Sequence, residues 1–192
     1  MLYFWEKPKN CTNNLIAVYR RDISPDRFLF LDGITVEKEK IDQKAIFKHS
    51  MSKDKIISYD CIPNNSESPL VNQRIVELLL EHAPDDVQFI DAEVHCKDGV
   101  LTNYKLLNVT STFTGIDHEK SIYTKFQDTD HILRFRRLVY KPGCMGIHML
   151  ARDNEYKVHL LIAEEIKQLF EKEKFKGIWF VTPEELFALI YS

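Results

Sequence analysis

Apolar residues recur at helical spacing in the middle of the chain. Four of them follow one another at i, i+4, i+7 and i+8 and therefore lie on one face of a helix: Val71, Ile75, Leu78 and Leu79. Asn72 stands near the start of this stretch, where its short amide can accept hydrogen bonds from the first free backbone N–H groups. The pattern predicts an amphipathic helix with Asn72 as its N-cap.

Two further helices are predicted in the last third of the chain. Residues 158–175 contain a short apolar run followed by a second amphipathic pattern. Near the end, Thr182 is the predicted N-cap of a short helix and Pro183 its first helical residue. Glu185 stands three residues after Thr182, which is the spacing of a capping box.

Most of the remaining apolar segments predict strands. The predicted extended segments are residues 1–5, 13–21, 55–62, 123–126, 131–140 and 177–181. Two Asp-Gly pairs predict β-hairpins, at Asp32-Gly33 within residues 27–36 and at Asp98-Gly99 within residues 85–109. In the longer hairpin we expect Val87, Phe89, Tyr104 and Leu106 to pack under the helices, while its acids stay in water.

Two segments have less regular patterns. Residues 37–55 are rich in charge and predict either a short helix or a solvated excursion. Residues 63–69, PNNSESP, are rich in turn-forming residues and predict a loop.

The two main helix-then-strand units align with each other without a gap. Ile75 matches Ile166, which lies 91 residues later, and Phe89 matches Phe180 at the same offset. The other matched pairs are also apolar. This alignment predicts an internal repeat of one supersecondary unit, although two ordinary amphipathic segments can also match by coincidence.

These elements predict an α+β fold with a mixed, largely antiparallel sheet. Two amphipathic helices from the internal helix–strand repeat and a short C-terminal helix complete it. A length of 192 residues suits one domain, so we expect residues 1–192 to form a single domain with a strand-rich N-terminal part, residues 1–62.

Composition and charge narrow the class of protein. Hydrophobic residues make up 44% and charged residues 29%, as in ordinary globular proteins, and the formal net charge of −3 argues against a general nucleic-acid binder. The first residues, MLYFWEKPKN, lack the basic leader and long apolar run of a signal peptide. We therefore expect a cytoplasmic protein that contacts no membrane, with four reduced thiols: Cys11, Cys61, Cys96 and Cys144.

No motif for catalysis, a metal or a cofactor is evident, and we expect none of the three. The densest titratable group is Asp117-His118-Glu119, which could form an acid–base pair but is more simply a set of solvated loop charges. Asp128-Thr129-Asp130 begins like a calcium loop but lacks the glycine and distal glutamate that such a loop needs.

Three arginines lie around Phe135, an arrangement that could suggest nucleic-acid binding. On a regular strand Arg134 and Arg136 share one face, whereas Phe135 and Arg137 take the other. A sheet with one polar face explains this pattern more simply, and the negative net charge favours that interpretation.

Several segments together resemble the immunity protein 11 family. They are LVNQRIVELLLEHAPDDVQFIDAEV, DGVLTNYKLLNV, GIDHEKSIYTKF and LIAEEIKQLFEKEKFKGIWFVTPEEL, and their order and spacing resemble the family's pattern over residues 69–185. Each motif is a soft apolar pattern with a few anchors, so the resemblance depends on their combination.

The resemblance implies a bacterial immunity protein that binds a cognate secreted toxin and neutralises it inside the cell. Nucleases are among the toxins that the resemblance implies. It brings no catalytic residues with it. We expect acidic side chains to meet a basic toxin surface, and the candidates are Asp85, Asp86, Asp117, Glu119, Asp128 and Asp130. The alternatives are an enzyme with Asp117 and His118 as its acid–base pair, or a structural or regulatory partner that offers its hairpin edge to another strand.

Overall fold

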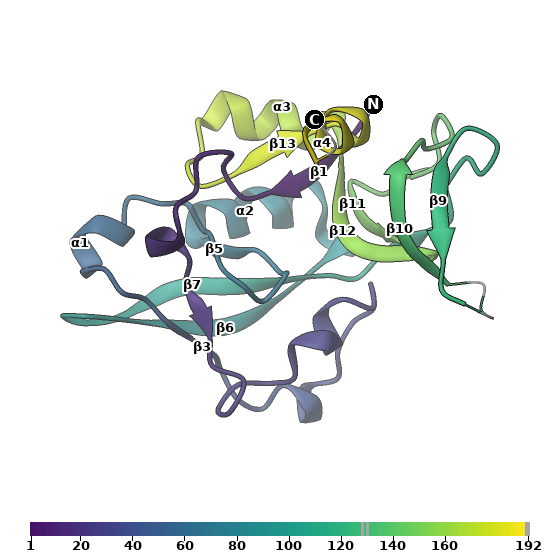
Figure 1. Cartoon of the computed structure of the whole chain (residues 1–192). Helices are drawn as coiled ribbons and strands as arrows, with labels where there is room; N and C mark the ends of the chain where they lie inside the picture. Colours follow the sequence, from purple (N-terminus) through teal and green to yellow (C-terminus); the bar gives the residue numbers. More distant parts are fainter. Residues whose placement is uncertain (128, 130, 191–192) are drawn as a thin grey trace.

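The computed structural model describes residues 1–127, 129 and 131–190, which form two β-sheets, a separate two-stranded ribbon and four α-helices (Figure 1). The first sheet has the order β2 (Val18–Tyr19), β3 (Ala45–Lys48), β6 (Val87–Cys96), β7 (Gly99–Val109), β5 (Leu70–Asn72) and β4 (Cys61–Ile62). The second has the order β13 (Trp179–Val181), β1 (Leu2–Glu6), β12 (Tyr156–Ala163), β11 (Leu150–Asp153) and β8 (Thr112–Phe113). The ribbon consists of β9 (Ile122–Lys125) and β10 (Ile132–Arg137).

Strand pairs are antiparallel except β3 with β6 and β8 with β11, so the predicted α+β class with mixed, mainly antiparallel pairing is confirmed. The strands divide into two sheets and a ribbon, however, where the sequence predicted one sheet. The helices are α1 (Lys53–Ile56), α2 (Gln73–His82), α3 (Glu164–Glu173) and α4 (Pro183–Ile190). None of the helices in the described ranges is long and apolar enough to cross a membrane.

Helices α2 and α3 share one core between the two sheets. Ile75 and Leu79 of α2 and Ile166 and Phe170 of α3 are all buried in the same cluster, together with side chains from both sheets. In Figure 1, α2 lies between the long β6–β7 hairpin and strands β1 and β13. The side-chain oxygen of Asn72 accepts a hydrogen bond from the Ile75 N–H at 3.3 Å, as predicted for the N-cap.

The two strand–helix–strand units have the same arrangement. Helices α2 and α3 begin and end 91 residues apart, at Gln73 and Glu164 and at His82 and Glu173. In each unit one antiparallel strand separates the two flanking strands: β7 separates β5 from β6, and β1 separates β12 from β13.

The register through these inserted strands also agrees with the offset. Leu70, Leu106 and Ile90 form one row across the first sheet. Leu161, Phe4 and Val181 form the equivalent row across the second sheet. Leu70 and Leu161, like Ile90 and Val181, differ by the offset of 91 residues. The internal repeat of one supersecondary unit stays a prediction.

The long hairpin turns one residue earlier than predicted. Cys96 pairs with Gly99, so the connecting residues are Lys97 and Asp98. Val87 packs against the helices and Phe89 against the same cluster, as expected.

Tyr104 and Leu106 of the hairpin belong instead to the cluster on the opposite face of the sheet. Because side chains alternate along a strand, it is Leu107 and Val109 that reach the helices from β7.

The prediction of a hairpin at residues 27–36 is wrong. Arg27–Phe30 form a 3-10 helix, and the Asp26 side chain caps it by accepting from the Phe28 N–H at 3.1 Å. Phe30 and Val36 are buried against the outer face of the first sheet. The apolar residues of this segment therefore cover a sheet and do not form one.

Three other segments near the N-terminus also differ from the prediction. Residues 13–21 form a 3-10 helix at Asn13–Leu15 and then the two-residue strand β2, and the strand in residues 55–62 is limited to β4 after the end of α1. The charge-rich residues 37–55 include β3, which pairs in parallel with β6 inside the sheet. Four residues, Ala45–Lys48, are too few for strand alternation to stand out among the neighbouring charges.

Helix α4 and the ribbon cover the outer face of the second sheet. Phe187 of α4 and Phe135 of β10 are buried in one cluster with Phe4 of β1. The predicted capping box is present: the Thr182 N–H donates to Glu185 Oε2 at 3.0 Å, and the Glu185 N–H donates to Thr182 Oγ1 at 3.2 Å.

The edges of the two sheets meet at Cys61 and Gly177. The Lys176 carbonyl accepts from the backbone N–H groups of Asp60 and Cys61 at 3.1 and 3.0 Å. Gly177 has φ +94°, and a Cβ atom at this position would collide with the Cys61 carbonyl oxygen. Only glycine permits this approach of one backbone to the other.

We predict that G177A is strongly destabilising. Gly143 is the matched control, because its φ is +69° but a Cβ atom there would have nothing within 4 Å. G143A should cost about 1–2 kcal/mol for the left-handed backbone alone, whereas G177A should cost at least about 3 kcal/mol, as expected where a clash adds to backbone strain. Urea unfolding of both variants measures the difference, and equal losses would contradict the close approach of the two sheets.

Candidate functional site

The β9–β10 ribbon stands apart from both sheets at one end of the molecule (Figure 1). Its inner side is fixed by Phe135, whose ring lies 5.4 Å from that of Tyr123 and 4.9 Å from that of Tyr156, centre to centre. At its base, the Asp117 N–H donates to the Val139 carbonyl at 2.8 Å. One side of the ribbon is therefore built into the core, and the other faces solvent.

Two β-bulges change which side chains of β10 face outwards. The register shifts between Ile132 and Arg134 and again between Phe135 and Arg137. Because each bulge inserts one extra residue, the regular alternation is lost. The prediction that Arg137 shares the face of Phe135 is therefore wrong: Phe135 is buried and Arg137 is exposed.

The outward side of the ribbon is basic and apolar. Arg134, Arg136 and Arg137 are all exposed, and none has an ion pair among the described residues. Ile122 and Leu133 beside them are 55% and 46% exposed. The sequence showed the three arginines, but without the bulges it did not indicate that all of them share the solvent side with apolar residues.

Asp86, one of the acidic side chains predicted to contact the toxin, lies in the interior of the protein. It is 4% exposed and accepts from Ser111 Oγ at 2.6 Å and from the Met149 and Leu150 N–H groups at 2.6 and 3.1 Å. His148 Nδ1 lies 2.7 Å from Asp86 Oδ1, the oxygen that also accepts from Ser111, whereas Met149 and Leu150 donate to Oδ2. The expectation that Asp86 stays in water is wrong, because its carboxylate connects the end of α2 to β11.

Asp117 and Glu119 lie in the loop before β9 and differ in their surroundings. The side chain of Asp117 is bonded to Lys120, through the backbone N–H at 3.2 Å and Nζ at 2.9 Å. These contacts hold the pKa of Asp117 below its usual range. Glu119 is exposed and has no ion pair within the part of the chain that the structure describes.

The other acidic candidates are not gathered with these two. Asp85 is exposed beside the buried Asp86, at the end of α2. Asp128 and Asp130 lie outside the described residues. Among the described candidates, Glu119 is the exposed acid next to the ribbon. Asp117 is only 9% exposed and is paired with Lys120, so the expectation that it is a solvated loop charge is wrong.

His118 does not form the acid–base pair considered from the sequence. Its Nδ1 lies 2.9 Å from the Tyr123 hydroxyl and its Nε2 lies 3.0 Å from Glu155 Oε1, while Asp117 is bound by Lys120. His118 thus links the ribbon to the turn between β11 and β12. In residues 1–127, 129 and 131–190, no group of three or more His, Cys, Asp or Glu side chains could hold a metal ion.

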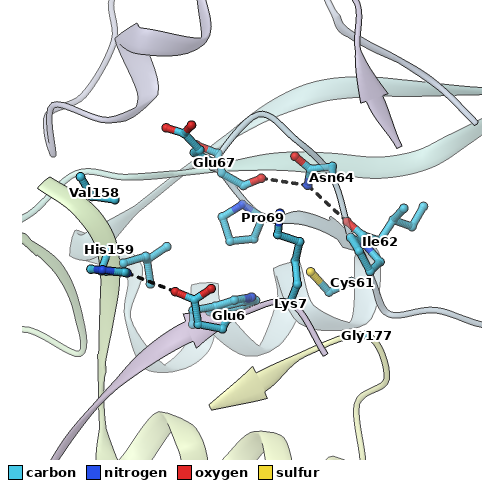
Figure 2. A pocket seen from close by; sticks show the side chains of 14 residues that line it. Glu6, Lys7, Cys61, Ile62, Asn64, Glu67, Pro69, Val158, His159 and Gly177 are labelled. Atoms are coloured by element: carbon cyan, nitrogen blue, oxygen red, sulfur yellow. Dashed lines mark hydrogen bonds and ion pairs between the residues drawn. The ribbon is translucent and has the colours of Figure 1, made fainter. Parts of the chain in front are cut away.

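A cleft of about 250 Å³ lies where the sheets adjoin, between the end of β1, β4, β12 and residues 63–69 (Figure 2). Glu6 and His159 lie in it, with Glu6 Oε1 3.1 Å from His159 Nδ1. Cys61 also lines the cleft, but burial raises the pKa of its thiol to about 12, so it is not a thiolate nucleophile.

The predicted loop at residues 63–69 is packed into the protein. Asn64, Ser66 and Ser68 are buried, and Asn64 Nδ2 donates to the Ser68 carbonyl at 3.1 Å. Glu67 has φ +69°, a strained value for a residue other than glycine. A loop with turn-forming composition is normally solvated, so this burial could not be predicted from the residue types.

Arg152 explains part of this packing. It is fully buried, and its guanidinium donates to the carbonyls of Lys157 at 2.8 Å and Glu67 at 3.2 Å. Burial lowers its pKa to about 10. No carboxylate lies within ion-pair distance of this guanidinium among the described residues, so carbonyl dipoles stabilise its charge. Through its two hydrogen bonds, Arg152 holds the loop at residues 63–69 against the second sheet.

Comparison with known proteins identifies the family. A family model described as "Immunity protein family (Imm11)" matches residues 9–185. The chain therefore belongs to the Imm11 immunity protein family, as its motifs suggested. The match begins at residue 9, so it also includes most of the N-terminal part that those motifs did not cover. No curated protein matches the chain.

We predict that D86N destabilises the protein and that D85N does not. An amide at position 86 cannot accept all four hydrogen bonds and directs an NH₂ group at other donors. The expected loss is about 3 kcal/mol for Asp86, given that bonds to charged groups contribute about 1.5–3 kcal/mol. The exposed Asp85 should change the free energy of unfolding by less than about 0.5 kcal/mol. Urea unfolding compares the two, and similar losses would show that the Asp86 bonds contribute little.

Proposed function

We propose that this protein binds a cognate secreted toxin in the cytoplasm and neutralises it by covering the toxin's active site or functional surface. Membership of the immunity protein family, over residues 9–185, is the observation that carries the proposal. A nuclease is one candidate activity for the toxin. In this proposal the protein acts by binding alone and uses no cofactor.

The ribbon and the loop before it are the proposed contact region. Phe135 and Tyr123 fix the ribbon from within, and Asp117 orders the loop through Lys120. A surface that is already ordered loses little conformational entropy on binding, which favours tight association. Among the described acids of this region, Glu119 is exposed and has no ion pair, so it is available to meet a basic group on the toxin.

The long β6–β7 hairpin serves as scaffold in this proposal. Its strands pair from Val87 with Val109 to Cys96 with Gly99, and both of its faces are covered by apolar clusters. It holds the helices and the N-terminal segment in place. An enzyme built on Asp117 and His118 is less well supported, because Lys120 binds the first and Glu155 and Tyr123 bind the second.

A tagged pull-down from the native host, read by mass spectrometry and followed by titration calorimetry, tests the proposal. We expect a one-to-one complex of nanomolar affinity with the C-terminal domain of a large secreted protein, and loss of that domain's toxicity in the complex. Recovery of no partner, or only of further copies of this chain, would contradict the proposed function.

We predict that E119K slows association with the toxin several-fold, with a larger effect at low salt, because charges at the edge of an interface mainly steer encounter. Glu39→Lys is the matched control, because it changes the net charge by the same amount. Glu39 is also exposed, but it lies in the N-terminal segment, outside the proposed contact region. Surface plasmon resonance at two salt concentrations measures both rates. Equal association rates for the two variants would remove Glu119 from the contact region.

A further inference from the structure

The side chains on the outward side of the ribbon face solvent and do not belong to the apolar core. We name it the arginine face and define it by Arg134, Arg136, Arg137, Ile122 and Leu133. Its three cations have no ion pair among the described residues, and its two apolar side chains are about half exposed.

The backbone irregularity of β10 creates this face. Without the bulges, Leu133, Phe135 and Arg137 would alternate onto the same side of the strand. The observed register shifts leave Phe135 inside and bring Leu133 and Arg137 out. Bulges that redirect side chains in this way are frequent next to functional sites.

The composition of the face fits a protein partner. Arginine beside exposed aliphatic residues is typical of protein interfaces, where arginine is enriched among the residues that contribute most to affinity. A nucleic acid is a poorer match, because Glu119 and Asp117 lie at the base of the ribbon, Asp128 and Asp130 follow in the sequence between its strands, and the net charge is −3.

We propose that the arginine face docks onto an acidic surface of the toxin and supplies most of the affinity of the complex. This inference rests on the proposed function, which it deepens by naming the partner surface. The arginines would pair with carboxylates, while Ile122 and Leu133 would be buried between them. The toxin surface expected here is thus opposite in charge to the basic one that the acidic residues alone suggested.

The test uses the full chain and the toxin domain recovered by the pull-down. Arg134→Glu/Arg136→Glu is the test variant, and Arg21→Glu/Lys38→Glu is the control, since both control residues are exposed without an ion pair among the described residues. We expect at least a hundredfold weaker binding for the test variant, by calorimetry, and less than a threefold change for the control. Circular dichroism and urea midpoints should match the wild type, because all four side chains are exposed.

The outcomes separate this inference from the proposed function. Toxin binding that is equally tight in wild type and test variant would overturn the inference and leave the proposed function standing. If the wild type binds no toxin, both fail. Restoration of binding when acidic residues of the toxin are changed to lysine would support the inference directly. Binding of the wild type to a DNA or RNA duplex at 150 mM salt, lost in the test variant, would show instead that the face serves a nucleic acid.

Discussion

The fold depends on one constraint: each of the two sheets is apolar on both faces, so each face must be covered by other parts of the chain. The inner faces are covered together, because α2 and α3 both bury their apolar residues in a single core between the sheets. The outer face of the first sheet, with Leu70 and Leu106, is covered by the N-terminal segment around Phe30. The outer face of the second, with Phe4 and Leu161, is covered by α4 and the ribbon. Burial of this apolar area is the main favourable term in folding.

Two buried polar groups then fix the layers relative to each other. Asp86 connects the end of α2 to β11, and Arg152 connects β11 to the loop at residues 63–69. Burial of such groups is costly unless hydrogen bonds satisfy them, so their geometry is narrowly defined. The ribbon begins close to these connections, since the Asp153 carboxylate accepts from the Gly115 N–H at 2.9 Å, two residues before Asp117. The position of the ribbon is thereby tied to the core and is not left to a flexible loop.

The sequence predicted those elements whose local chemistry is sufficient. The helical spacing around Ile75, the N-cap at Asn72 and the capping box at Thr182 and Glu185 depend only on neighbours in the chain. It failed where the tertiary environment decides. Phe30 and Val36 look like strand residues but cover a sheet, and PNNSESP looks like an exposed loop but is buried around Arg152.

The candidate site was affected in the same way. Asp85 and Asp86 are equivalent in a sequence, yet one is exposed and the other accepts four hydrogen bonds inside the protein. The two bulges of β10 leave no trace in the pattern of its residues, so the exposure of Arg137 could not be foreseen.

The ribbon has two sides with separate physical requirements. Its inner side must complete the core of the second sheet, which fixes Phe135 and Tyr123. Its outer side has no such requirement, so the side chains there can change with little effect on the fold. A protein that must recognise one toxin and reject others needs a surface of this kind, because specificity depends on charge patterns that repel the wrong partner as well as attract the right one. Cations on the strands, with Glu119 at the base, form a mixed charge pattern of the kind that the proposed binding role requires.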